Sequence, residues 1–270
     1  MRDDCGWVNM VYSNPALILS WLTPMNRFYR RLLTTLVAVM LTGCAPTSEL
    51  LNDDPDPLEG YNRAMFAVND AVDKALFKPV AQVYQKALPD PVITSIGNFF
   101  SNLNDVVVLV NDVLQFEFHQ AAQTSSRLVF NTTFGVLGLF DVASRMELPK
   151  NRADFGQTLG RWGFGEGYFI VLPFLGPSTV RDTFGLVGNF FVNPVTWATD
   201  SDRVMWSLWG LELINRRAGL LQIERAFADA QIDPYSFQRS AYLQQRRNLV
   251  YDGQPPQPDF DFENPDHPLQ

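Results

Sequence analysis

The chain has few of the residues that build metal centres or disulfide frameworks. It contains two cysteines and two histidines among 270 residues, and both cysteines, Cys5 and Cys44, lie in the N-terminal part. Two cysteines cannot form a disulfide framework, and two histidines leave little for a zinc site. We therefore expect no metal and no dissociable cofactor.

Basic residues are scarce relative to acidic ones. Lysine and arginine number 21 against 29 aspartate and glutamate, which gives a formal net charge of −8. A nucleic-acid-binding protein usually carries a basic surface, so this balance argues against a nucleic-acid partner. After Cys44 the sequence also lacks an uninterrupted run of about 18 apolar residues, so we expect no true transmembrane helix there.

Motifs for catalysis are missing as well. The sequence contains no Gly-x-Ser-x-Gly turn, no phosphate-binding loop and no His-Glu-x-x-His. A serine hydrolase would have to use His119, which we interpret instead as a surface or helix-terminal residue. Ser178 fits a turn and helix N-cap before Arg181 and Asp182. We therefore predict that the protein is not an enzyme, with a lipid hydrolase as one alternative.

The N-terminal part has the pattern of an export signal. Arg27, Arg30 and Arg31 precede the uncharged stretch Leu32–Gly43, which leads to Cys44. A basic segment, a short apolar segment and small residues form a secretory signal peptide. Leu-x-Gly-Cys at this place resembles a bacterial lipobox, in which the cysteine receives diacylglyceryl and acyl groups; an ordinary signal peptide followed by a buried cysteine is the alternative. Alanine after the cysteine favours sorting to the outer membrane.

These patterns predict the organisation of the chain. Signal peptides run about 15–30 residues, so we predict that Met25 is the initiator and that residues 1–24 are not part of the protein. Residues 25–43 are the predicted signal peptide, 44–55 a lipidated tether and 56–253 the folded domain. Residues 254–270 are acidic and rich in proline, which is typical of a disordered tail.

Between the tails the hydrophobic pattern is mainly helical. Hydrophobic residues make up 46% of the chain, with 21 phenylalanines, enough to exclude wholesale disorder. Apolar residues at helical spacing predict one helix from Tyr61 to Leu76, ended by Lys78-Pro79. Further helices are predicted at 93–114 (one long or two short), at 120–130 continuing into 128–140, at 206–213, with Arg216 and Arg217 near its end, and at 235–251.

One short segment differs from the helices. Five glycines between Gly156 and Gly167 lead into the apolar run Tyr168–Pro173. Such a run predicts a small strand or a buried connection. A dinucleotide-binding loop follows a strand and opens a helix, and here the order is reversed, so nucleotide binding is not expected.

A series of short motifs runs through the predicted domain. They are Asp56–Arg63, Met65-Phe66, Asn69, Lys78–Ala81, Tyr84, Asn98-Phe99, Asn102-Leu103, Asp154–Gly160, Trp162-Gly163, Val171–Pro173, Gly176–Ser178, Arg181-Asp182, Asp233–Tyr235, Arg239, Ala241–Leu243 and Gln245-Arg246. In this order they resemble the MlaA (VacJ) family of outer-membrane lipoproteins. The similarity covers about residues 56–253, nearly all of the predicted fold.

The resemblance implies a function in lipid transport. Proteins of this family form a ring-like bundle of amphipathic helices embedded in the outer membrane and associate with porin trimers. They remove mislocalised phospholipids from the outer leaflet through an amphipathic channel and pass them to a periplasmic carrier protein, which maintains lipid asymmetry. The alternative from another class is a structural lipoprotein that scaffolds an outer-membrane complex without transporting lipid.

The residues give candidate sites for this function. Cys44 is the predicted lipidation site, and because one acyl chain binds membranes only marginally, several chains and apolar helices would add to the attachment. Asn62, Asn69 and Asp73 share one face of the first predicted helix and are candidates for a polar path for headgroups, with a solvated helix face as the alternative. Arg181, Arg216 and Arg217 are expected to form ion pairs or to face solvent rather than to bind headgroup phosphates.

Overall fold

The computed structural model describes residues 56–199, 201–227 and 233–256. All of them belong to one compact unit. The predictions for the initiator Met25, the signal peptide, Cys44 and its tether, and the tail from residue 257 onward lie outside the described residues.

The described part is mainly helical, as predicted. Its elements in chain order are α4 (Glu59–Val72), η1 (Asp73–Phe77), α5 (Lys78–Ala87), α6 (Asp90–Leu114), α7 (Phe118–Thr133), α8 (Val142–Arg145), α9 (Phe155–Arg161), β1 (Phe169–Leu172), β2 (Gly176–Thr179), α10 (Val180–Val192), α11 (Pro194–Trp197), α12 (Asp202–Phe227) and α13 (Pro234–Val250).

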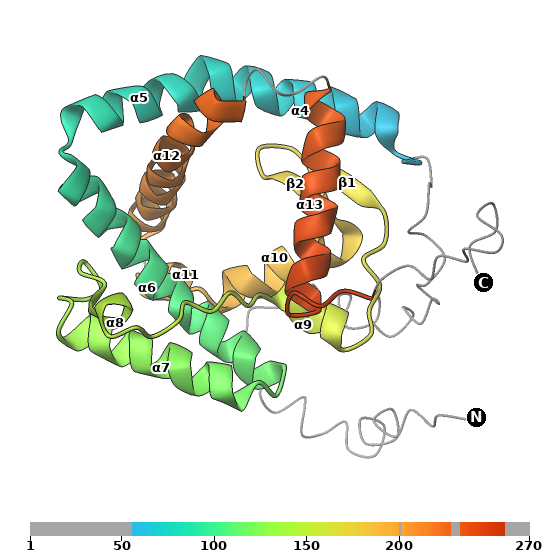
Figure 1. Ribbon diagram of the computed structural model, residues 1–270. Coiled ribbons are helices and arrows are strands. Elements are labelled where there is room, and N and C mark those ends of the chain that lie inside the picture. The colour runs from blue at the N-terminus through green and yellow to red at the C-terminus, as the bar shows by residue number, and fades with distance from the viewer. Residues whose placement is uncertain (1–55, 200, 228–232, 257–270) are drawn as a thin grey trace, which may run out of the picture. The chain divides into compact units, whose positions relative to one another are not determined.

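The packing contacts of this unit close into a ring. Helix α4 contacts β1, the β-hairpin contacts α13, α13 contacts α9, and α9 contacts α10. Helices α10 and α6 are in contact, and α5 leads from α6 back through η1 to α4 (Figure 1). Helix α12 lies against both α5 and α6, and α7 against α6. The predicted ring-like arrangement of helices is confirmed.

The first helix does not end at Pro79, so that prediction is wrong. The chain passes from α4 through the π-helical turn η1 into α5, and Pro79 lies in the first turn of α5. Proline clashes with the carbonyl four residues before it in an α-helix. The chain reaches Pro79 through the wider turn of a π-helix, in which the Lys78 amide donates to the Asp73 carbonyl oxygen five residues before it, and the helix continues into α5.

Helix α6 is a single helix of 25 residues, one of the two predicted forms. Among the described residues, it alone is long and apolar enough to cross a membrane, judged by length and composition only. Packed core helices have the same features. Two carboxylates interrupt its apolar sequence: Asp105 pairs with Lys150, and Asp112 accepts a hydrogen bond from Thr124.

Helix α7 ends at Thr133 rather than continuing to Phe140, so that part of the prediction is wrong. The chain turns at Gly135 and Gly138, where Gly138 has a φ of 91°. A Cβ at Gly138 would lie 2.4 Å from the Cβ of Asn102 on α6. The two glycines therefore let the chain turn back against α6, a tertiary contact that the uncharged sequence pattern does not show.

The other predictions agree better with the structure. Residues 169–172 form the predicted short strand, paired antiparallel with β2 so that Phe169 lies opposite Thr179 and Leu172 opposite Gly176. The last helix has nearly the predicted bounds. Helix α12 extends to Phe227, well beyond the predicted end near Arg217.

Apolar burial in this unit is modest. One cluster joins Ala81 of α5 to Ala218 and Leu221 of α12, and the other joins Phe169 and Val171 to Tyr235. Polar and charged side chains are buried in comparable number, among them Asn62, Asn102, Asp105, Asn111, Asp112, Thr124, Arg127, Asn131, Gln157, Thr158, Arg181, Asp182, Glu212 and Arg246. Hydrogen bonds and ion pairs therefore carry much of the internal organisation.

Candidate functional site

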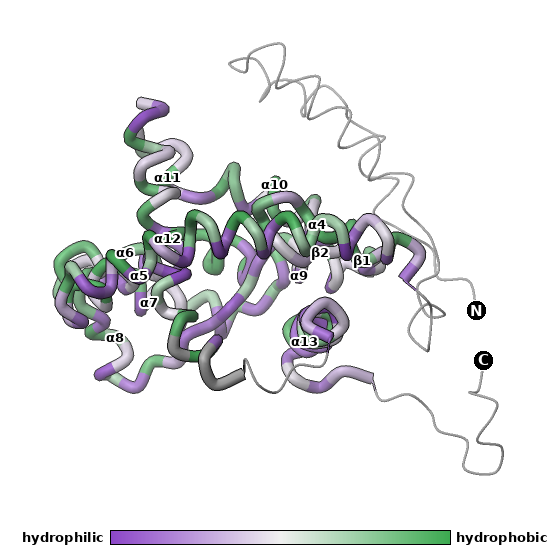
Figure 2. Tube along the Cα trace, turned by 90° about the horizontal axis from the view of Figure 1, so that it is seen from above, coloured by the Kyte–Doolittle hydropathy of each residue, from purple (hydrophilic) through white to green (hydrophobic). Residues whose placement is uncertain are grey.

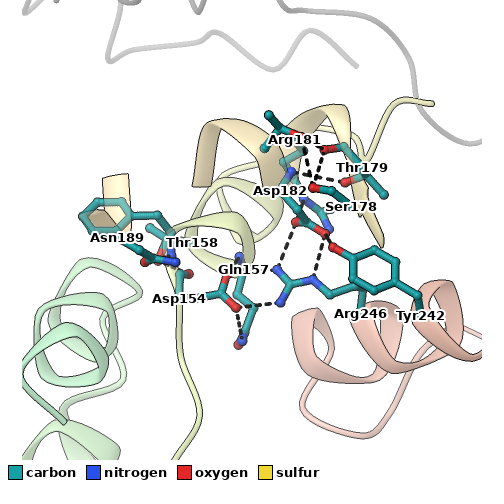
Figure 3. Close-up of polar contacts among 12 residues, drawn as sticks. Asp154, Gln157, Thr158, Ser178, Thr179, Arg181, Asp182, Asn189, Tyr242 and Arg246 are labelled. Carbon is teal, nitrogen blue, oxygen red and sulfur yellow. Dashed lines mark hydrogen bonds and ion pairs between the residues drawn. The ribbon is translucent and has the colours of Figure 1, made fainter. Parts of the chain in front are cut away.

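A buried arginine of α13 joins three elements of the ring. Two guanidinium nitrogens of Arg246, Nη1 and Nη2, lie 2.6 and 2.9 Å from the carboxylate oxygens of Asp154, at the start of α9. Its Nε and Nη2 lie 2.8 and 2.9 Å from the carboxylate of Asp182 on α10 (Figure 3). Paired contacts of this kind fix orientation as well as charge. We call Asp154, Arg181, Asp182, Tyr242 and Arg246 the Arg246 cluster.

Local structure places each carboxylate of this cluster. Asp154 caps α9 by accepting a hydrogen bond from the backbone amide of Gln157 (2.9 Å), as N-cap aspartates do. The Asp182 carboxylate accepts further hydrogen bonds from the Tyr242 hydroxyl (2.9 Å) and from Arg181 Nε (3.1 Å). Every oxygen of both carboxylates thus has a donor.

Glycine at position 156 is required by this arrangement. A Cβ there would lie 2.5 Å from Asp182 Oδ1 and 2.7 Å from Arg246 Nη2. On α10, a Cβ at Gly185 would lie 2.4 Å from the backbone nitrogen of Gly156. The two glycines let α9 and α10 approach closely enough for one guanidinium to reach both carboxylates.

The charges of the Arg246 cluster alter its titration. Burial alone raises the pKa of Asp154, but hydrogen bonds and attraction from Arg246 outweigh it and hold that pKa below its usual value. Burial lowers the pKa of Arg246 in turn, and the two carboxylates more than compensate. The Asp154–Arg246 ion pair therefore stays charged. Nearby, burial raises the pKa of Glu166, although the charges of Arg181 and Arg247 lower it in part.

A second cluster joins the start of the domain to the start of α13. The Asp56 carboxylate accepts hydrogen bonds from the Asn62 amide (3.0 Å) and from the Tyr235 hydroxyl. Burial raises the pKa of Asp56, and these hydrogen bonds lower it further than burial raises it. Arg63 lies 2.8 Å from the Asp233 carboxylate and covers the ring of Tyr235 at 4.5 Å. The first and one of the last sequence motifs therefore meet in space.

Asn62, Asn69 and Asp73, the three residues predicted to line a headgroup path, all form hydrogen bonds or ion pairs with other parts of the folded unit. Asn62, fully buried, donates to the Phe169 carbonyl oxygen (3.0 Å) and accepts from the Val171 amide (2.8 Å). Asn69 makes the same pair of bonds with Leu172 (2.9 Å) and Phe174 (2.8 Å). Both asparagines hold the β-hairpin against α4, and Asn62 is not on a solvated face. The headgroup path stays a prediction.

Asp73 forms an ion pair. Arg181, Arg216 and Arg217, which were expected to form ion pairs or to face solvent, are ion-paired as well. Arg217 contacts both oxygens of Asp73 at 2.7 Å and Glu224 at 2.7 Å, which joins η1 to α12. Arg181 lies 3.1 Å from Asp182, and Arg216 pairs with Glu212 one turn away. Contact of these arginines with headgroup phosphates would require exchange of these ion pairs.

The residues of the hydrolase alternative have separate partners. His119 is exposed in the first turn of α7, as predicted, with its ring 2.9 Å from the Gln123 amide. Ser178 lies in β2, where its hydroxyl is bonded to Thr183 and to the Thr179 carbonyl oxygen. The helix N-cap is Thr179, one residue after the serine that the sequence analysis favoured.

Sequence reasoning did not identify the pairing of Asp154, Asp182 and Arg246. The signal was present, because these residues belong to three of the motifs that carry the family resemblance. Asp154 and Arg246 are 92 positions apart, however, and no local periodicity links them.

The surface of the same unit is rich in apolar side chains. Large hydrophobic residues with a half or more of their surface exposed include Leu76, Val83, Phe116, Phe118, Val129, Phe134, Val136, Leu137, Phe140, Trp162, Tyr168, Phe174, Leu175, Trp197, Trp206, Leu220 and Ile223. In Figure 2, hydrophobic residues predominate along α10, which lies in the ring wall. Apolar exposure on this scale marks contact with a membrane or a partner.

A helical ring with paired charges inside and apolar side chains outside is typical of a membrane-associated protein. Comparison with known proteins makes the class specific. Residues 54–249 match the family described as MlaA lipoprotein, and the chain belongs to that family.

Named relatives agree with this family. The intermembrane phospholipid transport system lipoprotein MlaA of Escherichia coli is 34% identical over 222 residues, which cover 79% of this chain and 85% of that protein. The protein of the same name in Haemophilus influenzae is 31% identical, over 83% of this chain and 92% of that protein. A solved structure described as "Structural basis for maintenance of bacterial outer membrane lipid asymmetry" has 32% identity and a TM-score of 0.65. It matches 73% of this chain and 100% of its own.

Proposed function

We propose that this chain is an outer-membrane lipoprotein that removes mislocalised phospholipids from the outer leaflet and passes them through an amphipathic channel to a periplasmic carrier. This activity maintains the lipid asymmetry of the outer membrane. The family membership and the names of the relatives support the proposal. No reaction is needed for such transfer, so the proposal includes no catalytic step.

The observation that carries the proposal is the inverted distribution of polarity. Charged and amide side chains such as Arg246, Asp182 and Asn62 are buried, whereas large apolar side chains such as Phe134, Phe174 and Trp206 are exposed. In water, exposed apolar surface costs free energy, about 25 cal/mol per Å². In a bilayer the same surface is favourable, and buried polar groups must find partners within the protein.

The attachment to the membrane has two proposed parts. Cys44 carries diacylglyceryl and acyl groups, and the exposed apolar side chains add buried area, since one acyl chain alone binds only marginally. A porin trimer and a soluble periplasmic lipid carrier are the proposed protein partners, and phospholipid is the cargo. In this arrangement the protein is embedded in the outer membrane and faces the periplasm.

Cells that lack the chain test the proposal. Outer-leaflet phospholipid is measured in the deletion strain and after complementation with wild type or Cys44→Ala. We expect phospholipid to accumulate on deletion and to be cleared by wild type but not by Cys44→Ala.

The same assay separates the alternatives. An outer leaflet unchanged by deletion would favour a structural lipoprotein that scaffolds a complex. A hydrolase predicts that His119→Ala fails to complement, whereas lipid transfer predicts that it complements fully.

A further inference from the structure

Helix α6 combines the length and composition of a membrane span with a packed position in the folded unit. It contacts α7, α9, α10, α11 and α12 and forms part of the ring wall (Figure 1). Its side chains Phe100, Val107 and Val108 are buried. An apolar helix of this kind suits the finished fold. Before the chain has folded, however, the same segment has the composition to enter a bilayer.

Two carboxylates interrupt the apolar sequence of this helix. Asp105 lies well inside α6, Asp112 lies in its last turn, and the two flank the apolar run Val106–Val110. Apart from Asp90, the first residue, they are the charged residues of the helix. Both are only 1% exposed. Aspartate is almost never buried to this degree unless it is fully paired.

The folded unit compensates these two carboxylates incompletely. Lys150 pairs with one oxygen of Asp105, and the Thr124 hydroxyl donates to one oxygen of Asp112 (2.7 Å). The other oxygens, Asp105 Oδ2 and Asp112 Oδ1, are buried and accept no hydrogen bond within the described part of the chain. Burial is the largest cause that raises the pKa of each carboxyl above its usual value, against the effects of Lys150 and Thr124.

Stability of the fold therefore does not explain why these residues are aspartates. A buried acceptor without a partner costs free energy. Replacement of a buried ion pair by apolar residues of similar volume is often neutral or stabilising. An explanation has to come from a stage at which the two carboxylates are not buried.

Export of the chain is such a stage. The predicted signal peptide directs an unfolded chain across the inner membrane through a channel that releases sufficiently apolar segments sideways into the bilayer. On the scale from insertion experiments, one aspartate near the centre of a segment lowers the inserted fraction about 100-fold. In the unfolded chain both carboxylates are solvated, and they are ionised at neutral pH.

We propose that Asp105, and to a smaller extent Asp112, keep α6 out of the inner membrane during export, so that the whole chain reaches the periplasm. The inference rests on the proposed function, because only an exported protein requires this protection. It assigns to two buried carboxylates a role that is completed before the ring has formed.

Reporter fusions to the full-length chain test the proposal. Alkaline phosphatase fused after Gln270 is active only in the periplasm, and green fluorescent protein fused at the same position fluoresces only in the cytoplasm. The quantity measured is the ratio of fluorescence to phosphatase activity. We expect it to rise about 100-fold in Asp105→Leu, because α6 then stays in the inner membrane and the rest of the chain in the cytoplasm. Asp112→Leu, nearer the end of the segment, should raise the ratio less.

Matched variants separate the charge of the segment from the stability of the fold. The exchange Asp105→Val with Val106→Asp keeps the composition of α6 but removes the carboxylate from its position beside Lys150. It should be exported like wild type, although it destabilises the folded unit. Lys150→Met breaks the same ion pair without altering α6 and should also be exported. Asp70→Leu removes an exposed carboxylate of α4, paired with Lys74, and should leave the ratio unchanged.

Two results would overturn the proposal. One is a ratio for Asp105→Leu equal to that of wild type. The other is cytoplasmic fluorescence of the exchange variant or of Lys150→Met, because the effect would then come from the ion pair and not from the charge of the segment. The proposed function fails separately: a wild-type fusion that fluoresces in the cytoplasm would show that the chain is not exported. Export of both wild type and Asp105→Leu would contradict this inference alone.

Discussion

The Arg246 cluster and residues 134–146, which we call the α7–α8 corner, use polar and apolar side chains in opposite ways. In the cluster, the buried guanidinium of Arg246 pairs with the buried carboxylate of Asp182 and the partly exposed carboxylate of Asp154. In the corner, apolar side chains are exposed, while the backbone amides of Leu137, Gly138 and Phe140 are hydrogen-bonded within the protein. In a water-soluble domain, large apolar side chains are mostly buried and charged side chains mostly exposed.

The difference teaches where stability and function reside. The ion pairs join α9, α10 and α13, which are distant in sequence, so their loss should open the ring. The apolar corner joins only neighbouring elements, so its side chains are free to serve membrane contact. Variants in the cluster should therefore affect unfolding, and variants at the exposed corner should affect lipid binding.

The largest expected effect is that of Arg246→Met. Removal of the guanidinium leaves the buried carboxylate of Asp182 and the partly exposed carboxylate of Asp154 close together without their shared partner. Loss of one partner from a buried ion pair costs about 3–5 kcal/mol. Thermal unfolding of the purified protein in detergent measures it, with Arg203→Met as the exposed control. A loss below about 1 kcal/mol would show that the cluster behaves like a surface ion pair.

Gly156→Ala should cost about 1–3 kcal/mol by overpacking. The added methyl would meet the Asp182 carboxylate, and α9 would have to move away from α10. Gly210→Ala is a matched control because nothing lies within 4 Å of a Cβ at that helical position. It should stabilise by up to about 1 kcal/mol. Similar unfolding temperatures for the two variants would contradict the close approach of α9 and α10.

Asn62→Ala should cost about 2 kcal/mol, because it leaves the Phe169 carbonyl and the Val171 amide without their partner. Hydrogen exchange at the Val171 amide should accelerate, and the Arg246 cluster should keep its protection. Asn69→Ala, at a more exposed position of the same helix, should have a smaller effect. If exchange at Val171 were unchanged, Asn62 would be available for other contacts, as the predicted headgroup path requires.

Much of the fold was accessible from the sequence because its signals are local. The strand at Phe169–Leu172 and the helix at Pro234–Val250 follow from composition and spacing within a few residues. The stop at Pro79 was predicted wrongly because the rule assumes α-helical hydrogen bonds, and the chain reaches Pro79 through a π-helical turn. The continuation of α7 failed because the turn at Gly138 is specified by Asn102, on another helix.

The candidate site was less accessible for a related reason. Asn62 and Asn69 were identified from their shared helix face, yet their partners lie more than 100 positions away. A polar stripe on a helix has the same pattern whether it faces water, lipid headgroups or a hairpin. The burial of Asn62 excludes a helix face that is exposed to water, and that burial exists only in the folded unit.

The smallest predicted effect is a pH dependence at the polar side of the corner. Burial raises the pKa of Asp141, but hydrogen bonds from Ser144 and Asn131 and the charge of Arg127 lower it to about 2. A carboxyl with a depressed folded-state pKa stabilises the protein above its unfolded pKa, here near 4, and this contribution is lost as the pH falls toward 2. Because the group is partly exposed, about 1 kcal/mol is expected after screening. Unfolding temperatures between pH 5 and pH 2 should fall less steeply for Asp141→Asn than for wild type. Parallel curves would mean that Asp141 does not anchor the corner, and its outward apolar side chains would then depend on the contacts with α6 alone.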